Sequence, residues 1–260
     1  MDLELTGRRA FVTGASRGIG LAIARGLALE GAVVSIGARN PDGLAEAVDR
    51  LGREALTVHP YVVDVTDAAQ LEATIVQAAT EHGGLDLVVA NAGGSRGGGL
   101  LTSTADDWTH TLQLNVVHAA TAIRAAVPWL SSGHGAALVI ASISGWKPRA
   151  TSSYSVAKAA EIHLAAALAV ELARERIRVN TLSPGAVMFE GGRWARTRAA
   201  DPEAHDRFVA DNLPGGQFVT PEEVADAACF LLSPRAAGIN GAHVAVDGAQ
   251  DRPTDRPVYP

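Results

Sequence analysis

The chain has a single cysteine, few aromatic residues, no excess of basic residues and no long apolar run. One thiol, Cys229, excludes an intrachain disulfide, and its apolar neighbours predict a buried packing role. A net charge of −6 argues against a broad nucleic-acid face. The apolar runs fall short of the roughly 18 residues of a membrane span, and the first residues lack the apolar core of a secretory signal. We therefore expect a cytoplasmic protein with no nucleic-acid, membrane or metal partner.

What the chain does have is a regular alternation of short Val-, Ile- and Leu-rich runs with longer segments of helical periodicity. The runs expected as strands are RRAFVTG, GAVVSIGAR, ALTVHPYVVDV, LDLVVANAG, GAALVIAS, RIRVNTLSP and AHVAVDG. Apolar strands separated by crossover helices predict a parallel sheet covered on both faces. The fold class expected is α/β, a Rossmann-like doubly wound sheet of about seven strands in a three-layer α/β/α arrangement. A single domain is expected over residues 1–250.

Two segments break this rhythm. Residues 184–219 are rich in Gly and Pro around Trp194 and Phe208, and we expect a substrate lid with short helices at about 186–216. Arg193, Arg196 and Arg198 in this segment suggest an amphipathic or anionic substrate, or they are simply solvated. The proline-rich tail, residues 251–260, either frays or docks on a neighbouring subunit.

The first expected strand runs into TGASRGIG, a glycine-rich turn that leads directly into a helix. Gly14, Gly18 and Gly20 let the backbone turn tightly and approach a pyrophosphate, which the N-H groups of a helix N-terminus can bind. The spacing is G-x-x-x-G-x-G and not the common G-x-G-x-x-G, so a plain strand-to-helix turn is the alternative. The position at a strand end favours a nucleotide.

The second strand ends at Arg39 and Asn40, without the acid that an NAD site places near the ribose 2′-hydroxyl. Arg39 and Arg17 together can clamp a 2′-phosphate, since guanidinium groups match phosphate geometry. This pattern predicts NADP(H) in preference to NAD(H). The alternative is that both arginines are ordinary surface residues.

Two further strand ends carry candidate cofactor contacts. Asp64 can accept a hydrogen bond from an adenine amino group, although a helix cap is the other interpretation, for which Asp67 or Thr66 is better placed. Asn91 and Gly93 allow close approach to a ribose, or they form a turn. Their shared position at the carboxyl edge of the sheet is what supports the cofactor interpretation.

The most specific local feature is the pair Tyr154 and Lys158, which lie on one helix face. A nearby ammonium favours a phenolate, so Tyr154 is a candidate proton donor or acceptor, and a solvated helix face is the alternative. Ser142 at the end of the fifth strand can hydrogen-bond a carbonyl, with Ser144 as its competitor. Asn115 can hold a water in a locally distorted helical turn, although a helical Asn is often merely exposed.

In combination and order, these motifs, with SPG at 183–185 and VDG at 246–248, resemble the short-chain dehydrogenase/reductase family over residues 5–248. The ordinary-length branch with 3-oxoacyl carrier-protein reductase-like ketoreductases is the part of the family that the chain resembles. The resemblance implies an oxidoreductase in which Tyr154 is the acid/base, Lys158 binds the nicotinamide ribose, Ser142 steadies the carbonyl and Asn115 completes a water-linked proton relay. It also implies a homotetramer, with a dimer as the alternative. The cofactor contacts implied by motif and strand end are Gly14, Ser16, Arg17, Gly18, Ile19, Gly20, Arg39, Asn40, Asp64, Val65, Asn91, Ala92, Gly93, Tyr154, Lys158, Pro184, Gly185 and Val187.

One departure from the family pattern is Phe189, which stands where many members have a threonine that contacts the carboxamide. The resemblance implies reduction or oxidation of a small carbonyl or alcohol, with a 3-oxoacyl thioester, a secondary-metabolite ketone, a steroid or a sugar all compatible. The alternative function is a non-catalytic NADP(H)-sensing protein of the same fold. Loss of Tyr154 or Lys158 would have favoured it, and both are present.

Overall fold

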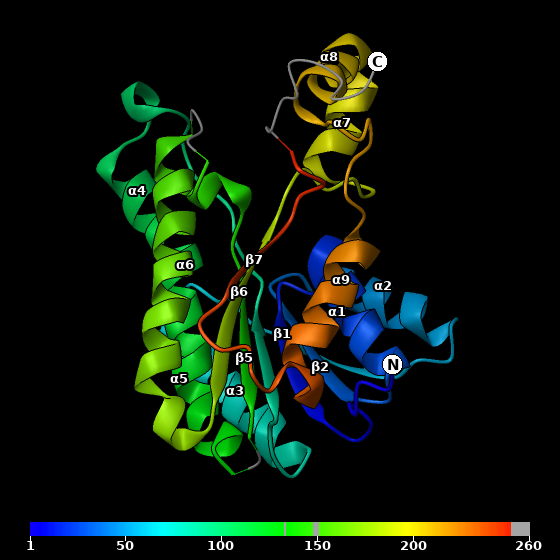
Figure 1. Cartoon of the computed structure of the whole chain (residues 1–260), viewed down its shortest axis with the longest axis vertical. Coiled ribbons are helices and arrows are strands. Elements are labelled where there is room, and N and C mark those ends of the chain that lie inside the picture. Colours follow the sequence, from blue (N-terminus) through cyan, green and yellow to red (C-terminus); the bar gives the residue numbers. More distant parts are fainter. Residues whose placement is uncertain (133, 148–150, 251–260) are drawn as a thin grey trace.

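Seven parallel strands form one sheet in the computed structural model, which describes residues 1–132, 134–147 and 151–250 (Figure 1). The strand order is β3-β2-β1-β4-β5-β6-β7, and every neighbouring pair is parallel. The doubly wound parallel sheet predicted from the sequence is confirmed. The strands are β1 (Arg9–Thr13), β2 (Val33–Ala38), β3 (Val58–Val62), β4 (Leu87–Ala90), β5 (Ala136–Ile140), β6 (Arg178–Pro184) and β7 (His243–Val246).

Helices cover both faces of this sheet, with α1, α2 and α9 on one side and α3, α5 and α6 on the other (Figure 1). Within the described ranges, no helix is long and apolar enough to cross a bilayer. The helices are α1 (Gly18–Leu29), α2 (Pro41–Gly52), α3 (Ala68–Glu81), α4 (Ala105–Leu112), α5 (His118–Leu130), α6 (Ser152–Glu171), α7 (Arg193–Ala200), α8 (Pro202–Asn212) and α9 (Pro221–Leu232). Short turns of helix are η1 (Leu100–Thr102), η2 (Gln113–Val117), η3 (Ile143–Gly145), η4 (Ala173–Glu175) and η5 (Pro234–Ala236).

The sheet separates two hydrophobic cores, because successive strand residues point to opposite faces. In β1, Val12 belongs to the core under α1 and α9, while Phe11 belongs to the core under α3 and α5, and both are fully buried. Each such side chain stabilises the fold by about 1.5–3 kcal/mol. Cys229 of α9 is buried against Gly26 of α1, so its expected packing role is confirmed.

The segment from 104 to 130, which the periodicity marks as one long helical stretch, is divided into three pieces. Helix α4 begins at a capping box formed by Thr104 and Asp107. It leads into η2, a π-helical turn, before α5 continues to Leu130. A π-turn inside an α-helix shifts the hydrogen-bond pattern by one residue and is frequent at functional sites. Asn115 lies in this turn, which is the local distortion expected there.

The lid helices α7 and α8 lie beyond the carboxyl end of the sheet and are joined to it by the segments before α7 and after α8 (Figure 1). Their contact is built on aromatic rings. The ring centroid of Trp194 lies 3.8 Å from that of Phe208 and 5.3 Å from that of Phe218. This aromatic cluster fixes the orientation of α7 relative to α8.

Candidate active site

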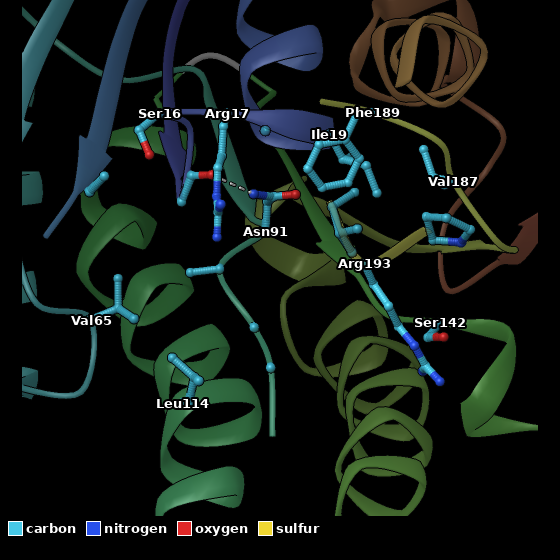
Figure 2. Close-up of a pocket in the computed structure, with 18 of the residues that line it drawn as sticks. Ser16, Arg17, Ile19, Val65, Asn91, Leu114, Ser142, Val187, Phe189 and Arg193 are labelled. Carbon is cyan, nitrogen blue, oxygen red and sulfur yellow. Dashed lines mark hydrogen bonds between the residues drawn. The ribbon is translucent and has the colours of Figure 1, made fainter. Parts of the chain in front are cut away.

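A cavity of about 1050 Å³ opens at the carboxyl ends of β1, β2, β4, β5 and β6. Parallel α/β sheets bind ligands at this edge, where the strand order reverses between β1 and β4. The structure brings most of the sequence-derived candidates together on its wall (Figure 2). Those that line it are Gly14, Ser16, Arg17, Ile19, Gly20, Arg39, Asn40, Val65, Asn91, Ala92, Gly93, Ser142, Tyr154, Lys158, Pro184, Gly185 and Val187.

The glycine-rich turn lies on the floor of this cavity and is tied to the end of β4 by Asn91. The Asn91 side-chain amide donates to the carbonyls of Thr13 (2.8 Å) and Gly14 (3.1 Å). In return, the Thr13 hydroxyl accepts from the backbone N-H groups of Asn91 (3.0 Å) and Ala92 (3.1 Å). Gly14 has φ of +64°, and a Cβ there would lie 2.9 Å from the Ala92 Cα. Both constraints require glycine at position 14. The hydrogen bonds of Thr13 and Asn91 hold the turn rigidly against the end of β4.

Helix α1 begins at Gly18 without an acidic residue in its first turn and without a side-chain cap from Arg17. No side chain therefore caps its first N-H groups, and these groups are free to bind an anion at the helix N-terminus. Gly18 itself does not line the cavity, because the ring of Phe189 covers it from the lid side.

One end of the cavity is bounded by Arg39 and Asn40 at the end of β2. The Asn40 side chain caps α2 by accepting from Asp42 N at 3.0 Å. Arg39 is 65% exposed and lies 4.0 Å from a carboxylate oxygen of Asp64. Only a weak ion pair therefore competes for its guanidinium.

Asp64 lies outside the cavity wall, and its own contacts are local. Burial acts to raise the pKa of Asp64, but hydrogen bonds from the Thr66 backbone (2.9 Å) and hydroxyl (2.7 Å), with the nearby Arg39, hold that pKa below its usual value. The cap of α3 is Asp67, which accepts from Gln70 N. Asp64 is therefore neither the cap of α3 nor part of the cavity wall, and its side chain bonds Thr66 within the loop. The neighbouring Val65 lines the cavity.

Tyr154 and Lys158 lie one turn apart on α6 and both line the cavity. The Lys158 ammonium is 5.7 Å from the Tyr154 ring centroid and only 3% exposed. It donates to the Ile140 carbonyl at 3.0 Å and lies 2.8 Å from Oε2 of Glu161. Burial acts to lower the pKa of Lys158, but Glu161 and Tyr154 outweigh it and raise that pKa above its ordinary value. The lysine is therefore a buried, charged ammonium beside a phenol.

Ser142 follows β5 on the same wall, where its hydroxyl accepts from Ser144 N at 3.2 Å. That bond leaves the hydroxyl proton free to donate into the cavity. Ser144 does not line the cavity, so the geometry prefers Ser142 of the two serines.

Asn115 lies behind the wall and is fully buried. Its side-chain amide donates to the carbonyls of Gly94 (2.7 Å) and Thr111 (2.6 Å), and its oxygen accepts from Gly94 N at 3.3 Å. A Cβ at Gly93 would lie 2.7 Å from this oxygen and 2.9 Å from the Lys158 ammonium nitrogen. Glycine at 93 therefore lets the loop after β4 lie against both polar groups.

Further residues of the cavity wall lie outside the motifs. Glu46, Leu114 and Ile140 were not expected there, whereas Phe189, Arg193, Trp194 and Arg196 belong to the segment expected as a lid. Two buried polar residues next to the site, His118 and Glu161, were not singled out either. Glu161 could have been found from its i, i+3 spacing to Lys158, whereas nothing local marks His118. The Thr13 hydroxyl lies 2.9 Å from Nε2 of His118. Burial, and to a smaller extent the positive charge of Lys158, lowers the pKa of His118 to about 3.

Comparison with known proteins agrees with this geometry. A family model with the description enoyl-(acyl carrier protein) reductase matches residues 14–249. Dehydrogenase/reductase SDR family member 4 from Oryctolagus cuniculus is 35% identical, covering 94% of each chain. Cis-4-hydroxycyclohexanecarboxylate dehydrogenase from Sinomonas cyclohexanicum is 38% identical, covering 93% of this chain and 95% of its own.

Among solved structures, L-sorbose reductase from Gluconobacter frateurii, complexed with NADPH and L-sorbose, superposes with a TM-score of 0.90. It is 31% identical, and the alignment covers 97% of this chain and all of the other. The fold, the order of the motifs and these matches over nearly the whole length agree. The chain therefore belongs to the short-chain dehydrogenase/reductase family of oxidoreductases.

Proposed function

We propose that this protein is an NADP(H)-dependent oxidoreductase that interconverts a carbonyl compound and its secondary alcohol, with Tyr154 as the acid/base. The observation that carries this proposal is the common wall formed by the Tyr154 phenol, the buried Lys158 ammonium and the Ser142 hydroxyl. This wall combines a proton donor, a fixed positive charge and a hydrogen-bond donor for a carbonyl oxygen.

The residues present fit a nicotinamide dinucleotide. Gly14 and Gly93, where a Cβ would collide with neighbouring atoms, let the ends of β1 and β4 lie close to Ala92, Asn115 and Lys158 at the cavity wall. A phosphate and a ribose would lie along this wall. Arg17 and Arg39 at the adenosine end support the preference for NADP(H), because they can hold a 2′-phosphate. Pro184, Gly185 and Val187 line the other end, where the nicotinamide would lie. The nicotinamide supplies or accepts the hydride when the cofactor is bound.

The proposed roles of the side chains follow from their places. In the reducing direction, Tyr154 gives its phenolic proton to the carbonyl oxygen, and Ser142 donates a hydrogen bond to the same oxygen. The ammonium of Lys158 stabilises the phenolate that remains. Asn115 holds the loop after β4 through Gly94, next to Lys158, and is the expected end of a proton relay from solvent.

The substrate class is a carbonyl compound or secondary alcohol of small to medium size. The similarity to proteins named for 4-hydroxycyclohexanecarboxylate and L-sorbose supports substrates with a ring or chain alcohol of this kind. Apolar side chains exposed on η2 and α6, Val117, Val156 and Val170, support assembly through these helices as a homotetramer or a dimer. Light scattering on the purified protein tests the oligomeric state, and fractionation of the native cells tests the proposed cytoplasmic location.

The first experiment follows oxidation of NADPH and of NADH in the presence of ketones, 3-oxoacyl thioesters and sugars, with Y154F beside the wild type. We expect faster turnover with NADPH and a loss of roughly a thousandfold or more in Y154F, with cofactor binding retained. Tight NADPH binding without turnover of any carbonyl would support the sensing alternative. Equal turnover by Y154F would contradict the assigned acid/base.

A further inference from the structure

The lid supplies positive charge to the substrate end of the cavity. Arg193 and Arg196 of α7 both line it, and Figure 2 shows Arg193 reaching from the lid toward Ser142. The acidic side chain on the cavity wall, among the residues described, is Glu46 of α2, near the adenosine end. The guanidinium of Arg193, which reaches toward Ser142, therefore faces no carboxylate across the described wall.

Arg193 and Arg196 differ in what holds their guanidinium groups. Arg196 donates to the Gly191 carbonyl at 2.6 Å and so secures the loop before α7. Arg193 lies over the ring of Trp194, 5.3 Å from its centroid, and no described carboxylate lies within ion-pair distance of it. Trp194 is in turn fixed by Phe208 and Phe218. Arg193 is exposed, it is held by the ring of Trp194, and no described hydrogen bond uses its donors.

We propose that the substrate carries a carboxylate and that Arg193 binds it while the carbonyl or alcohol carbon lies at Ser142 and Tyr154. A guanidinium group donates two parallel hydrogen bonds to a carboxylate, which orients as well as binds it. This inference rests on the proposed oxidoreductase function. The cofactor phosphates are the other source of negative charge, but Arg17 and Arg39 already serve the adenosine end, and Arg193 points away toward Ser142.

The test compares two probes, 4-oxocyclohexanecarboxylate and its methyl ester, which differ in charge but share the ketone. Wild type, R193A and R198A are assayed with NADPH, and Arg198 is a matched control because it is exposed on α7 and does not line the cavity. We expect R193A to lose about 10- to 100-fold in kcat/KM for the acid, mainly through KM, and to handle the ester as wild type does. R198A should behave as wild type with both probes.

Calorimetric binding of the acid to the enzyme with NADPH keeps this inference separate from the proposed function. Binding of the acid to wild type but not to R193A supports the inference even if neither probe is turned over. No binding of the acid, an equal loss for acid and ester in R193A, or a tenfold weaker NADPH affinity in R193A would each overturn it. The last outcome would assign Arg193 to a cofactor phosphate.

An independent observation concerns Glu161, a carboxylate on α6 that is only 1% exposed. Burying a carboxylate is unfavourable unless it is paired. Its Oε2 atom lies 2.8 Å from the ammonium nitrogen of Lys158, and the described residues offer it no other donor. The two side chains therefore form a close buried pair within the proposed catalytic group. Burial raises the pKa of Glu161 above its usual value, and the Lys158 ammonium acts against that rise.

We infer that Glu161 is a positioning residue that holds the Lys158 ammonium and offsets part of its charge at Tyr154. The charged or titratable groups acting on this ammonium are Tyr154 and Glu161 from α6, and the ammonium itself helps to lower the pKa of His118 on α5. Elements α4, η2, η3, η4, β5 and β6 also contact α6, and none of their described side chains contributes a charge that acts on Lys158.

The test is the pH profile of alcohol oxidation for wild type, E161Q, E161L and E171Q. Glu171 is a matched control because it is exposed at the end of the same helix. Removing the negative charge leaves more positive potential at the phenol, so the acidic limb of kcat/KM should move to lower pH by about one unit in E161Q. E161L should shift in the same direction if E161Q does not fold. Identical profiles for wild type and a folded Glu161 variant would overturn the inference.

Discussion

The aromatic ring of Phe189 lies directly against Gly18, the first residue of α1. A Cβ at position 18 would lie 2.8 Å from two ring carbons, and the backbone there has φ of +58°. The lid and the glycine-rich turn thus meet at a contact that leaves no room for a side chain at position 18. Phe189 stands where the family resemblance implies a threonine, and in this chain its ring closes the lid side of the α1 N-terminus.

Replacing Gly18 by Ala should weaken NADPH binding by about tenfold or more, because both the left-handed backbone and the ring oppose a methyl group. Fluorescence titration measures the affinity. The double variant G18A/F189T removes the ring but not the backbone strain, so it should recover part of the loss. G215A is the control, since nothing lies within 4 Å of a Cβ there. Full NADPH affinity in G18A would disprove the close contact.

Replacing Arg39 by Ala should raise the dissociation constant of NADPH by about 10- to 100-fold and leave that of NADH nearly unchanged. The reason is the loss of a guanidinium that can hold the 2′-phosphate, a group that NADH lacks. R50A, at an exposed position on α2, is the matched control. If R39A weakens both cofactors equally, Arg39 acts on the fold of the site and not on selectivity.

His118 should make the protein less stable as the pH falls below about 6.5. Burial lowers its pKa to about 3 in the folded state, so the unfolded chain takes up a proton in this pH range and the folded chain does not. His118 costs no stability above the pKa of the unfolded chain, about 6.5. At pH 5 it lowers the free energy of unfolding by about 2 kcal/mol. Urea unfolding of H118N between pH 7 and pH 5 should show a flatter decline. H163N, at an exposed site, should decline as wild type does.

Replacing Asn115 by Ala should lower the free energy of unfolding by about 1–3 kcal/mol, because the part-buried carbonyl of Gly94 and the buried carbonyl of Thr111 lose their donor. Turnover should fall as well, since the loop after β4 is no longer held beside Lys158. T109A removes an exposed bond to a helix carbonyl on α4 and should change stability by about 0.5 kcal/mol or less. Unchanged stability in N115A would show that water replaces the amide.

Several features of the site could be predicted because their causes are local. The i, i+4 spacing places Tyr154 and Lys158 on one helix face whatever lies around them. The carboxyl ends of parallel strands share an edge, so Gly14, Asn91 and Ser142 are neighbours once the alternating pattern is recognised. The distorted turn at Asn115 was expected, although the pattern did not show that it divides two helices.

Other features depend on residues far apart in sequence, and no local pattern indicates them. Asp64 and Val65 are adjacent, yet only Val65 reaches the cavity, because the side chain of Asp64 turns to Thr66. Asn91 is used to join β1 to β4, which follows from a contact between residues about 78 positions apart. Phe189 over Gly18 is likewise a contact between distant segments.

The family, the parallel sheet and the positions of the chemical groups follow from the amino-acid sequence, because strand alternation, glycine turns and helix spacing are short-range properties. Which polar groups are buried, and what they face, depends on the assembled fold. Folding encloses the neighbouring side chains of Lys158 and Glu161, buries His118 and so lowers its pKa, and brings Arg193 of the lid toward Ser142. These properties arise from the exclusion of water by elements distant in sequence, so they appear only when the sheet, its helices and the lid have assembled.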